Sequence, residues 1–329
     1  SPDGKTMAFQ STGELSGGTR LFNCRILTKS LTSDAPQLQV TSDGFGPTWS
    51  TDGATLAFLR RKGDLENLWT VKGTGGDEKQ VTMGGVHFSG YSFLPHNRWE
   101  VRDYDWSPDS RRMVYCSNKS GQSNVWIVSA DGSNETQISE NADGHLYFFG
   151  PAWSPDGKRI AYASVAGSAS TDGKKTWNIW VTDVAGGKPK VIFEASSVLR
   201  LIGWSGGGDK IIVGVAEGNV GSQPGLTDVN LFHVPARGGH ARRIARLKST
   251  YLSNSRLSPD GQFLAVASRQ DGRDNLHVIS LLSGKGRKVT GNTDSRVYFS
   301  DLTWSPDGRV IYYGKQTRSS LISMIENFK

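Results

Sequence analysis

The sequence predicts an all-β fold, a single β-propeller built from blades of four antiparallel strands. A phrase of the form W-S-P-D-G recurs seven times along the 329 residues, with some copies degraded. Each copy is followed by the same order of short apolar runs, and helix signals are almost absent. Repeats of about 40–50 residues that each hold four short strands are typical of propeller blades.

The elements of one unit can be assigned in chain order. The first strand is a short apolar stretch that ends in Trp-Ser, as in GPTWS and DYDWS. The turn S-P-D-G follows, where Pro fixes φ, Asp bonds nearby backbone and Gly accepts a positive φ. An alternating apolar run such as RIAYAS predicts the second strand. Asn and a large residue mark the third strand, as in NLWTV and NVWIV, and a Gly-rich turn precedes a fourth, such as EKQVT.

The spacing of the phrase sets the domain organisation. Its serine stands at positions 1, 50, 107, 154, 205, 258 and 305, and the units therefore start near 1, 49, 106, 153, 204, 257 and 304. We expect one propeller domain over residues 1–329 with seven blades, or six if an end unit is not a full blade. The first unit lacks its first strand and the last lacks its fourth. We therefore expect a part of the protein to precede residue 1, and the terminal segments to pair and close the ring.

Two copies of the phrase depart from the pattern. SGGGD at Ser205 lacks the Pro and shifts the Asp by two positions, while WSPDS at Trp106 has Ser110 in place of Gly. We expect a turn of a different type at Ser110, because serine resists a positive φ. Both departures argue against a strictly sevenfold ligand site.

Charge and cysteine content limit the partners. The net charge is +7, and most positive residues are dispersed apart from ARGGHARRIARLK at 236–248. This cluster indicates either solvated surface, which is the commoner case, or a footprint for an acidic polymer, nucleic acid or anionic lipid. No aromatic–basic stacking motif accompanies it, which makes nucleic acid an unlikely partner. Cys24 and Cys116 fall in different repeats and are interpreted as two buried thiols, with a disulfide as the open alternative, and the chain has no transmembrane run.

The repeated phrase resembles the TolB-like, or WD40-like, propeller repeat, whose hallmark is the W-S-P-D-G turn followed by an apolar strand. The resemblance covers nearly the whole chain. It implies a propeller and a periplasmic or extracellular location in a bacterial envelope. Members of this group include TolB itself, the propeller domains of prolyl-oligopeptidase-type peptidases, extracytoplasmic sensor domains and oligogalacturonate-lyase-like enzymes. The resemblance therefore leaves the function open.

Motifs for catalysis are weak. The pattern G-x-S-x-G of the peptidases' nucleophile elbow occurs only as GWSGG at 203–207, inside the degraded turn phrase, where no strand-to-helix turn is predicted, and no second domain remains once the repeats are counted. A metal-dependent lyase needs His or carboxylates around one cation, and His87, His96 and His145 are the histidines placed in loops that could gather together. We expect no catalytic residue, no metal and no cofactor. The seven turn aspartates are expected to bond local backbone rather than to form a cation ring.

The non-repeating parts of the chain carry the functional expectation. In a propeller, the connections from a fourth strand to the next first strand cluster on one face around the mouth of the channel, which we call the funnel face. The longest connection runs from Met83 to Asp105. Aromatic, histidine and arginine side chains in these connections suit a sugar, peptide or acidic ligand. The predicted ligand-binding residues are His87, Tyr91, Arg98, Trp99, Arg102, His145, Tyr147, Phe148, Arg200, Arg256, Arg296 and Tyr298.

Two functions remain open at this point. The first is a non-catalytic extracytoplasmic scaffold or sensor module that binds a protein, peptide or glycan at the funnel face. The second is a propeller enzyme of the polysaccharide-lyase or hydrolase type that uses loop His, Tyr and Arg at the same mouth. A third possibility is that the aromatics only plug the funnel while the arginines pair with nearby Asp103, Asp105, Asp294 and Asp301.

Overall fold

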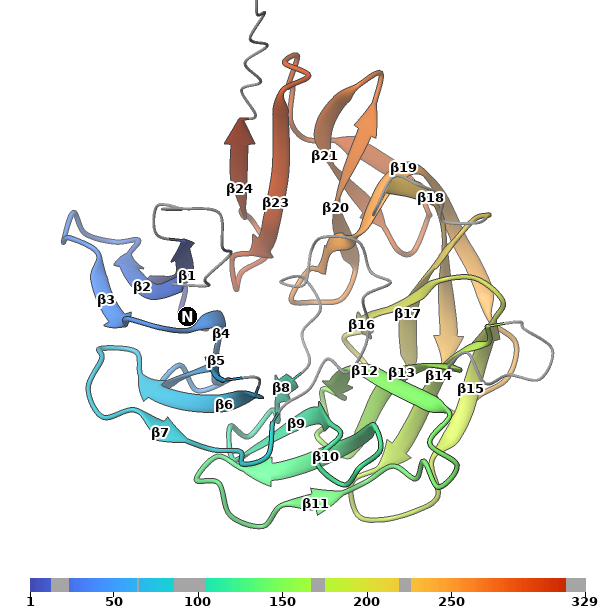
Figure 1. Cartoon of the computed structure of the whole chain (residues 1–329). Helices are drawn as coiled ribbons and strands as arrows, with labels where there is room; N and C mark the ends of the chain where they lie inside the picture. The colour runs from blue at the N-terminus through green and yellow to red at the C-terminus, as the bar shows by residue number, and fades with distance from the viewer. Residues whose placement is uncertain (13–23, 64, 86–103, 167–174, 219–225, 318–329) are drawn as a thin grey trace, which may run out of the picture.

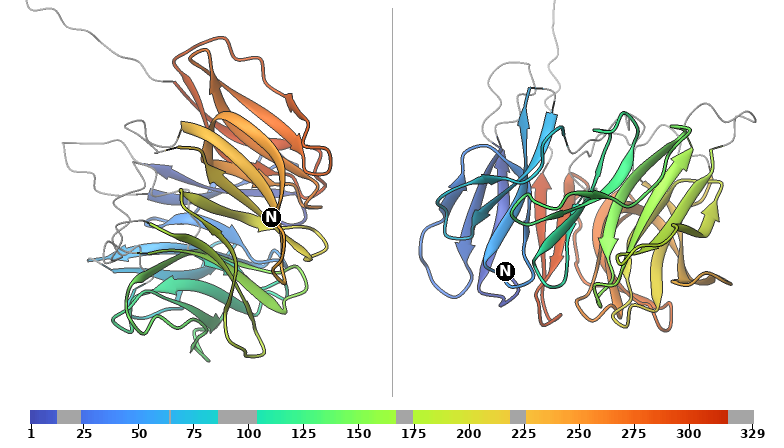
Figure 2. Two further views of the ribbon diagram at one scale, coloured as in Figure 1. Left: turned by 90° about the vertical axis from the view of Figure 1, so that its right-hand side faces the viewer. Right: turned by 90° about the horizontal axis from the view of Figure 1, so that it is seen from below.

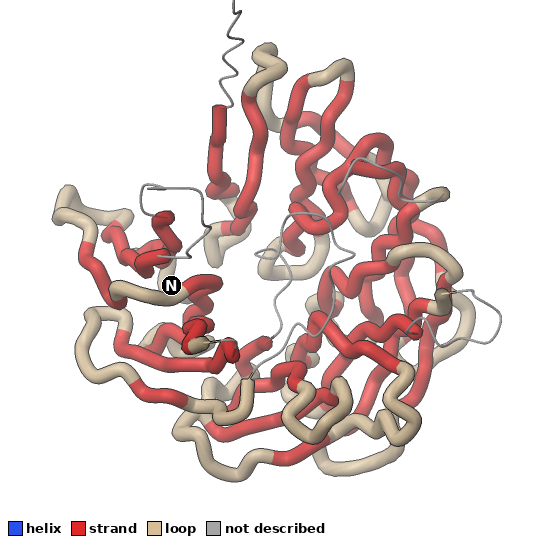
Figure 3. Tube along the Cα trace, viewed as in Figure 1, coloured by secondary structure: helices blue, strands red, loops and turns tan. Residues whose placement is uncertain are grey.

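The computed structural model describes residues 1–12, 24–63, 65–85, 104–166, 175–218 and 226–317. Within these ranges the chain forms 24 β-strands, joined by turns and loops without a helix (Figure 3). The described part therefore includes no helix that could cross a membrane. The strands form antiparallel sheets that follow one another around a ring (Figure 1), and side views show them next to each other (Figure 2).

The first four groups of strands follow the unit predicted from the sequence. Blade 1 has three strands, β1 (Thr6–Thr12), β2 (Cys24–Ser30) and β3 (Leu38–Thr41). Blade 2 has β4 (Phe45–Trp49), β5 (Thr55–Lys62), β6 (Leu65–Lys72) and β7 (Lys79–Gln80). Blade 3 has β8 (Tyr104–Trp106), β9 (Arg112–Ser117), β10 (Asn124–Ser129) and β11 (Thr136–Gln137). Blade 4 has β12 (Leu146–Trp153), β13 (Arg159–Ala166), β14 (Trp177–Asp183) and β15 (Lys190–Ala195).

The remaining strands continue the series. Blade 5 has β16 (Leu199–Trp204), β17 (Lys210–Ala216), β18 (Leu226–Pro235) and the first part of β19 (Arg242–Leu257). The second part of β19 begins blade 6, with β20 (Phe263–Gln270), β21 (Arg273–Ser280) and β22 (Gly286–Lys288). Blade 7 has β23 (Val297–Trp304) and β24 (Ile311–Thr317). Strands β4, β8, β12 and β16 lie near the centre of the ring, and β3, β7, β11 and β15 lie at its rim (Figure 1).

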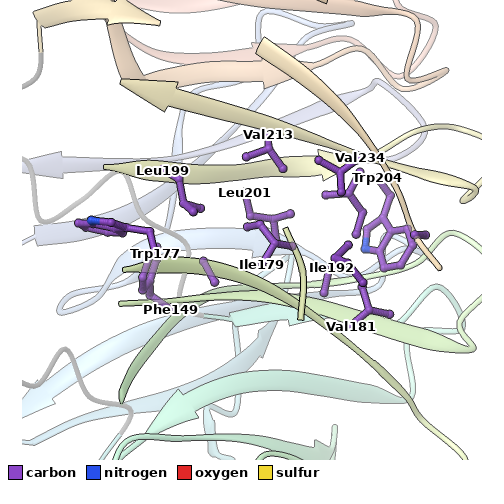
Figure 4. Packing of buried hydrophobic residues seen from close by; sticks show 14 of the residues in the cluster. Phe149, Trp177, Ile179, Val181, Ile192, Leu199, Leu201, Trp204, Val213 and Val234 are labelled. Carbon is purple, nitrogen blue, oxygen red and sulfur yellow. The ribbon is translucent and has the colours of Figure 1, made fainter. Parts of the chain in front are cut away.

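The tryptophan of the phrase ends the inner strand and packs between neighbouring blades. Trp106 is buried among residues of blades 2 and 3, and its indole donates to the carbonyl of Thr48 at 3.3 Å. Trp204 makes the same contact to Ala152 at 3.1 Å. It belongs to an apolar cluster between blades 4 and 5 that also includes Phe149, Ile179 and Val213 (Figure 4). The cores therefore lie between the blades, and the ring is held together by side chains from adjacent sheets.

The seven turns contact one another in a complete circle. A β-carbon placed on Gly157 would lie 3.7 Å from Pro108 Cδ, and one on Gly208 would lie 3.4 Å from Pro155 Cδ. The same proline-on-glycine packing joins the last turn to the first, because a β-carbon on Gly4 would lie 3.6 Å from Pro306 Cδ. Strand pairing between the terminal segments stays a prediction, since residues 318–329 lie outside the described ranges.

The two departures from the phrase have local reasons. A β-carbon on Gly206, at the Pro position of SGGGD, would lie 2.4 Å from the carbonyl oxygen of Asp260. The neighbouring turn thus approaches too closely for any side chain there. Ser110 has a φ of 60°, close to the 68° of Gly157 in the intact copy. The expectation of a different turn type at Ser110 was therefore wrong. Its hydroxyl accepts a hydrogen bond from the amide of Asp52 at 2.9 Å, which helps to hold this conformation.

Candidate functional site

The aspartates of the repeated turns are occupied by hydrogen bonds within their own turns. In each turn the serine hydroxyl donates to the aspartate at 2.5–2.9 Å. The same hydroxyl accepts from the backbone amide five residues further on, at 2.9–3.2 Å. The serine hydrogen bond is the main cause that lowers the pKa of all seven carboxyl groups. These carboxylates therefore stabilise turns, in line with the local interpretation.

The opposite end of the ring is the funnel face. Five of the predicted ligand-binding residues, His87, Tyr91, Arg98, Trp99 and Arg102, lie in 86–103 and so outside the described residues, as does His96. What the structure describes is the two ends of this connection. Gly85 donates its amide to Asn67 Oδ1 at 3.1 Å, and its carbonyl accepts from Ser117 Oγ at 2.5 Å. Tyr104 is buried, and its hydroxyl donates to the carbonyls of Gly46 and Ala57.

The connection before blade 4 carries the next three predicted residues in different environments. His145 is exposed and Tyr147 is 36% exposed. Phe148 is 4% exposed and packs edge-to-face on Tyr162 at 5.3 Å and on Trp180 at 6.2 Å. It therefore belongs to the core between blades 3 and 4. Below them Asn141 binds the backbone of Leu146 and of Ser123, so the connection is tied down from beneath.

The connection before blade 7 places Tyr298 beside an arginine that sequence reasoning missed. The guanidinium of Arg269 lies 4.6 Å from the centre of the Tyr298 ring, and its Nη1 lies 2.6 Å from Asp274 Oδ1. Asp274 is fully buried, and Tyr251 donates to it at 3.4 Å. Burial and the neighbouring carboxylate raise the pKa of Tyr251 to about 12, so its hydroxyl stays a donor. Only the sequence pattern R-Q-D-G-R-D, with Arg five residues before Asp, hinted at this pair.

Arg296, in the same connection, is a surface residue. Its side chain is 68% exposed and makes two hydrogen bonds to Asp294, at 3.1 and 2.9 Å. This pairing is the one expected if the arginines only serve structure, and it lowers the pKa of Asp294 to about 2 through the Arg296 hydrogen bonds. The exposed guanidinium nevertheless keeps further N–H donors available on the funnel face.

The two remaining arginines lie at opposite ends of inner strands. Arg200 is the second residue of β16, near the funnel face, and is half-buried. Arg256 is the last residue but one of β19, beside the turns, and its carbonyl accepts from Trp304 Nε1 at 3.0 Å. The structure therefore brings His145, Tyr147, Arg200, Arg296 and Tyr298 to one end of the ring and places Arg256 at the other.

A second repeated hydrogen-bond motif fixes the connections of the funnel face. It pairs an Asn of the third strand with a Ser or Thr after the fourth, and we call it the Asn clip. At the start of the third strand, Asn124 Oδ1 accepts from Ser139 Oγ at 2.9 Å, and that hydroxyl accepts from the amide of Val125 at 2.8 Å. Asn275 and Thr290 form the same clip in blade 6, and Asn67 and Thr82 form it in blade 2. The sequence signal was the Asn of the third strand together with the Thr or Ser that ends the fourth, but only the fold shows that they meet.

Metal and acid–base chemistry find little support among the described residues. Across those residues, no three His, Cys, Asp or Glu side chains lie close enough to hold a metal ion. His233 and His277 are half-buried, and burial is the main cause that lowers the pKa of both. His233 contacts Arg242 of the outer strand of blade 5, and His277 contacts Ser268 of the second strand of blade 6. The convergence of His87, His96 and His145 stays a hypothesis.

The ring of antiparallel blades with inner, centre-facing strands defines the class of protein as a β-propeller. The family model of the TolB beta propeller domain matches residues 131–327. The chain belongs to that family.

Two related proteins match parts of the chain. An uncharacterized protein from Agrobacterium fabrum is 24% identical over 224 residues, which are 64% of this chain and 66% of that protein. Dipeptidyl-peptidase 5 from Porphyromonas gingivalis is 30% identical over 118 residues, which are 33% of this chain and 17% of that protein. The chain matches less than two thirds of the length of either relative.

Solved structures share the fold. TolB from Acinetobacter baumannii superimposes with a TM-score of 0.55 at 16% identity, over 88% of this chain and 64% of that one. The β-propeller domain of the Trilobed protease from Pyrococcus furiosus gives 0.62 at 14% identity, over 94% and 90%. An oligogalacturonate lyase in complex with manganese gives 0.59 at 11% identity, over 94% and 84%. TolB, the propeller domain of a protease and a lyase thus share this architecture, so the fold alone does not select a function.

Proposed function

We propose that the protein is a non-catalytic, extracytoplasmic propeller that binds a protein, peptide or glycan at the funnel face. The observation that carries the proposal is the contrast between the two layers of that face. Beneath, the Asn clips of blades 2, 3 and 6 and the Arg269–Asp274 pair hold the connections in place. Above, the exposed side chains differ from blade to blade, as His145, Tyr147 and Arg296 illustrate.

A rigid base that presents variable side chains is the arrangement expected of a recognition surface. Tyrosine supplies a large contact area at low entropic cost, and arginine forms bidentate hydrogen bonds to carboxylates. Membership in the TolB propeller family supports both the binding role and a periplasmic or extracellular location. The alternative, a lyase or hydrolase at the same mouth, would draw on loop His, Tyr and Arg side chains as acid, base and anion binder.

The test compares a funnel-face variant with a turn-face control. Peptide and glycan arrays are probed with the wild-type protein, with the double variant Tyr147→Ala/Arg296→Ala, and with Lys158→Ala/Arg309→Ala, whose residues lie in the repeated turns. We expect the funnel-face variant to weaken binding to the selected probes by about tenfold or more, because an aromatic and a charged contact are lost. The turn-face variant should bind as the wild type does.

Equal binding by all three proteins would refute the funnel face as the binding site. A second assay tests the enzymatic alternative: the same peptide and glycan probes are incubated with the protein and analysed for cleavage. Turnover that is abolished by His145→Ala would replace the binding role by the enzymatic alternative.

A further inference from the structure

The rim of blades 4, 5 and 6 is continuous across the blade boundaries. The turn that precedes the outer strand of one blade packs on the outer strand of the blade before it. A β-carbon on Gly238 of blade 5 would lie 3.9 Å from Ile192 of blade 4. One on Gly284 of blade 6 would lie 2.2 Å from the carbonyl oxygen of Ile244 of blade 5. Side chains next to these glycines on neighbouring blades are therefore close neighbours on the surface.

This rim is strongly positive. Its three segments, 184–194, 236–246 and 281–290, contain nine Lys or Arg and one Glu, a net charge of +8. Arg246 is paired with Glu217 and Asp228. The other eight are exposed, and within the described part of the chain none of them forms an ion pair: Lys188, Lys190, Arg237, Arg242, Arg243, Lys285, Arg287 and Lys288.

The corresponding segments of blades 1 to 3 have the opposite sign. Residues 31–41, 73–82 and 130–140 contain six Asp or Glu and one Lys, a net charge of −5. The overall charge of +7 is therefore unevenly placed, with the positive charge concentrated on one arc of the rim. Repulsion among unpaired like charges lowers the stability of the folded protein. A random distribution of these charges over the surface would avoid much of that repulsion.

The pKa values of two histidines in the same region reflect its positive charge. Burial lowers the pKa of His233, and the nearby charges of Arg242 and Lys210 lower it further. Burial also lowers the pKa of His277, with an added contribution from Lys288. The carboxylate of Asp209 acts in the other direction on His233 but does not outweigh the cations.

The shape of the rim selects among anionic partners. The three segments lie on the outside of a ring (Figure 1), so the surface is convex. A planar bilayer would touch one blade at a time, and duplex DNA is stiff over about 150 base pairs. Single-stranded nucleic acid gains much of its affinity by stacking on aromatic side chains. Among Phe, Tyr and Trp the three segments hold only Phe193, and it packs on Phe232 of the next blade. A polymer with carboxylates on successive sugar units avoids these limits and offers the groups that arginine binds best.

We propose that the rim of blades 4 to 6 is a binding surface for an acidic polysaccharide, which would lie across the outer strands of three blades. This surface is separate from the funnel face, and a ligand on the rim leaves that face open. The exposed arginines would bind carboxylates bidentately and the lysines would add point charges.

The experiment measures binding of polygalacturonate by isothermal titration at low and moderate salt. The rim variant is Arg242→Glu/Arg243→Glu/Arg287→Glu, and the matched control is Lys5→Glu/Lys72→Glu/Lys79→Glu, which makes the same change in net charge on blades 1 and 2. Methyl-esterified polygalacturonate, which lacks the charge, is the ligand control. A second rim variant, Lys285→Gln/Lys288→Gln, removes charge without reversing it, and circular dichroism checks the fold of all proteins.

We expect the rim variant to weaken binding at least about tenfold, since three exposed charge contacts become repulsive, while the control changes binding by less than about threefold. The neutral rim variant should fall between them, and the esterified polymer should not bind. Equal loss in the rim and control variants would overturn the proposal in favour of a net-charge effect. Tighter binding of single-stranded DNA or of phosphatidylglycerol vesicles than of polygalacturonate would assign the rim to those partners instead. Loss of polygalacturonate binding in the funnel-face variant Tyr147→Ala/Arg296→Ala, with binding by the rim variant unchanged, would assign the polymer to the funnel face and overturn the rim proposal, which separates this test from the one above.

Discussion

Ser154 shows at the residue scale why the turn phrase keeps its serine. The side chain is fully buried, donates to Asp156 at 2.5 Å and accepts from the amide of Arg159 at 2.9 Å. The turn backbone adds two bonds, from Ser154 to Arg159 and from Gly157 to Ser154. One hydroxyl thus links a strand amide to a carboxylate as the chain reverses, and the same carboxylate also accepts from the amide of Lys158 at 3.1 Å.

Replacing Ser154 by Ala should destabilise the protein by about 1–2 kcal/mol, because a buried donor and a carboxylate lose a partner. The matched control is Ser205→Ala in the degraded turn. Ser205 is only half-buried, and its two hydrogen bonds are longer, at 2.9 and 3.2 Å. We expect the control to cost less than about 0.5 kcal/mol. Urea unfolding of both variants measures the difference, and equal costs would contradict the role given to the buried hydroxyl.

At the scale of elements, the third strand does more than fill the sheet. An Asn at or near its start clips the connection that leaves the fourth strand, so the outer strand and the funnel face are coupled. In blade 6, Asn275 Oδ1 accepts from Thr290 Oγ1 at 3.0 Å and from the amide of Asn292 at 2.9 Å. The clip therefore lies directly beneath the segment that presents Arg296.

Replacing Thr290 by Val removes the hydroxyl but keeps the shape of the side chain. The amide of Leu276, which donates to Thr290 Oγ1 at 3.0 Å, loses its partner. We expect its hydrogen exchange to speed up by about fivefold or more, the equivalent of roughly 1 kcal/mol. Amides of β13 in blade 4 serve as the internal reference. Unchanged protection at Leu276 would show that the clip does not hold this connection.

At the scale of the whole molecule, the seven turns together make the free energy of unfolding depend on pH. Each turn aspartate has a lowered pKa in the folded protein. A lowered carboxyl pKa contributes stability that is present above the unfolded value of about 4 and is lost as the pH falls through the folded value. The lowered pKa values of His233 and His277 act earlier, because protonation then favours the unfolded chain below about pH 6.5.

We therefore expect the free energy of unfolding to decline in two stages on acidification, a small one below about pH 6.5 and a larger one below about pH 4. Chemical denaturation at constant ionic strength from pH 7 to pH 3 measures both. The double variant His233→Gln/His277→Gln should abolish the first stage and keep the second. A stability that does not change down to pH 3 would contradict the effect assigned to the turns.

The fold could be predicted from the sequence because its signals are local and repeated. Trp, Pro, Asp and Gly act within a few residues of each other, and seven copies in register leave few architectures other than a propeller. Cys24 and Cys116 are both buried free thiols, as expected of small apolar side chains.

Contacts between distant residues could not be predicted in this way. The pairing of Arg269 with Tyr298, the burial of Phe148 and the clip of Asn275 by Thr290 join residues that are brought together only when sheets form and pack side by side. Ser110 keeps the glycine conformation because a neighbouring blade donates a hydrogen bond to it. The sequence by itself determined the repeated strands and turns, since short-range sterics and hydrogen bonds decide them. Only the tertiary structure decided which non-repeating side chains share a face and where the charges of three blades meet on one rim, because those depend on how the blades are ordered in space.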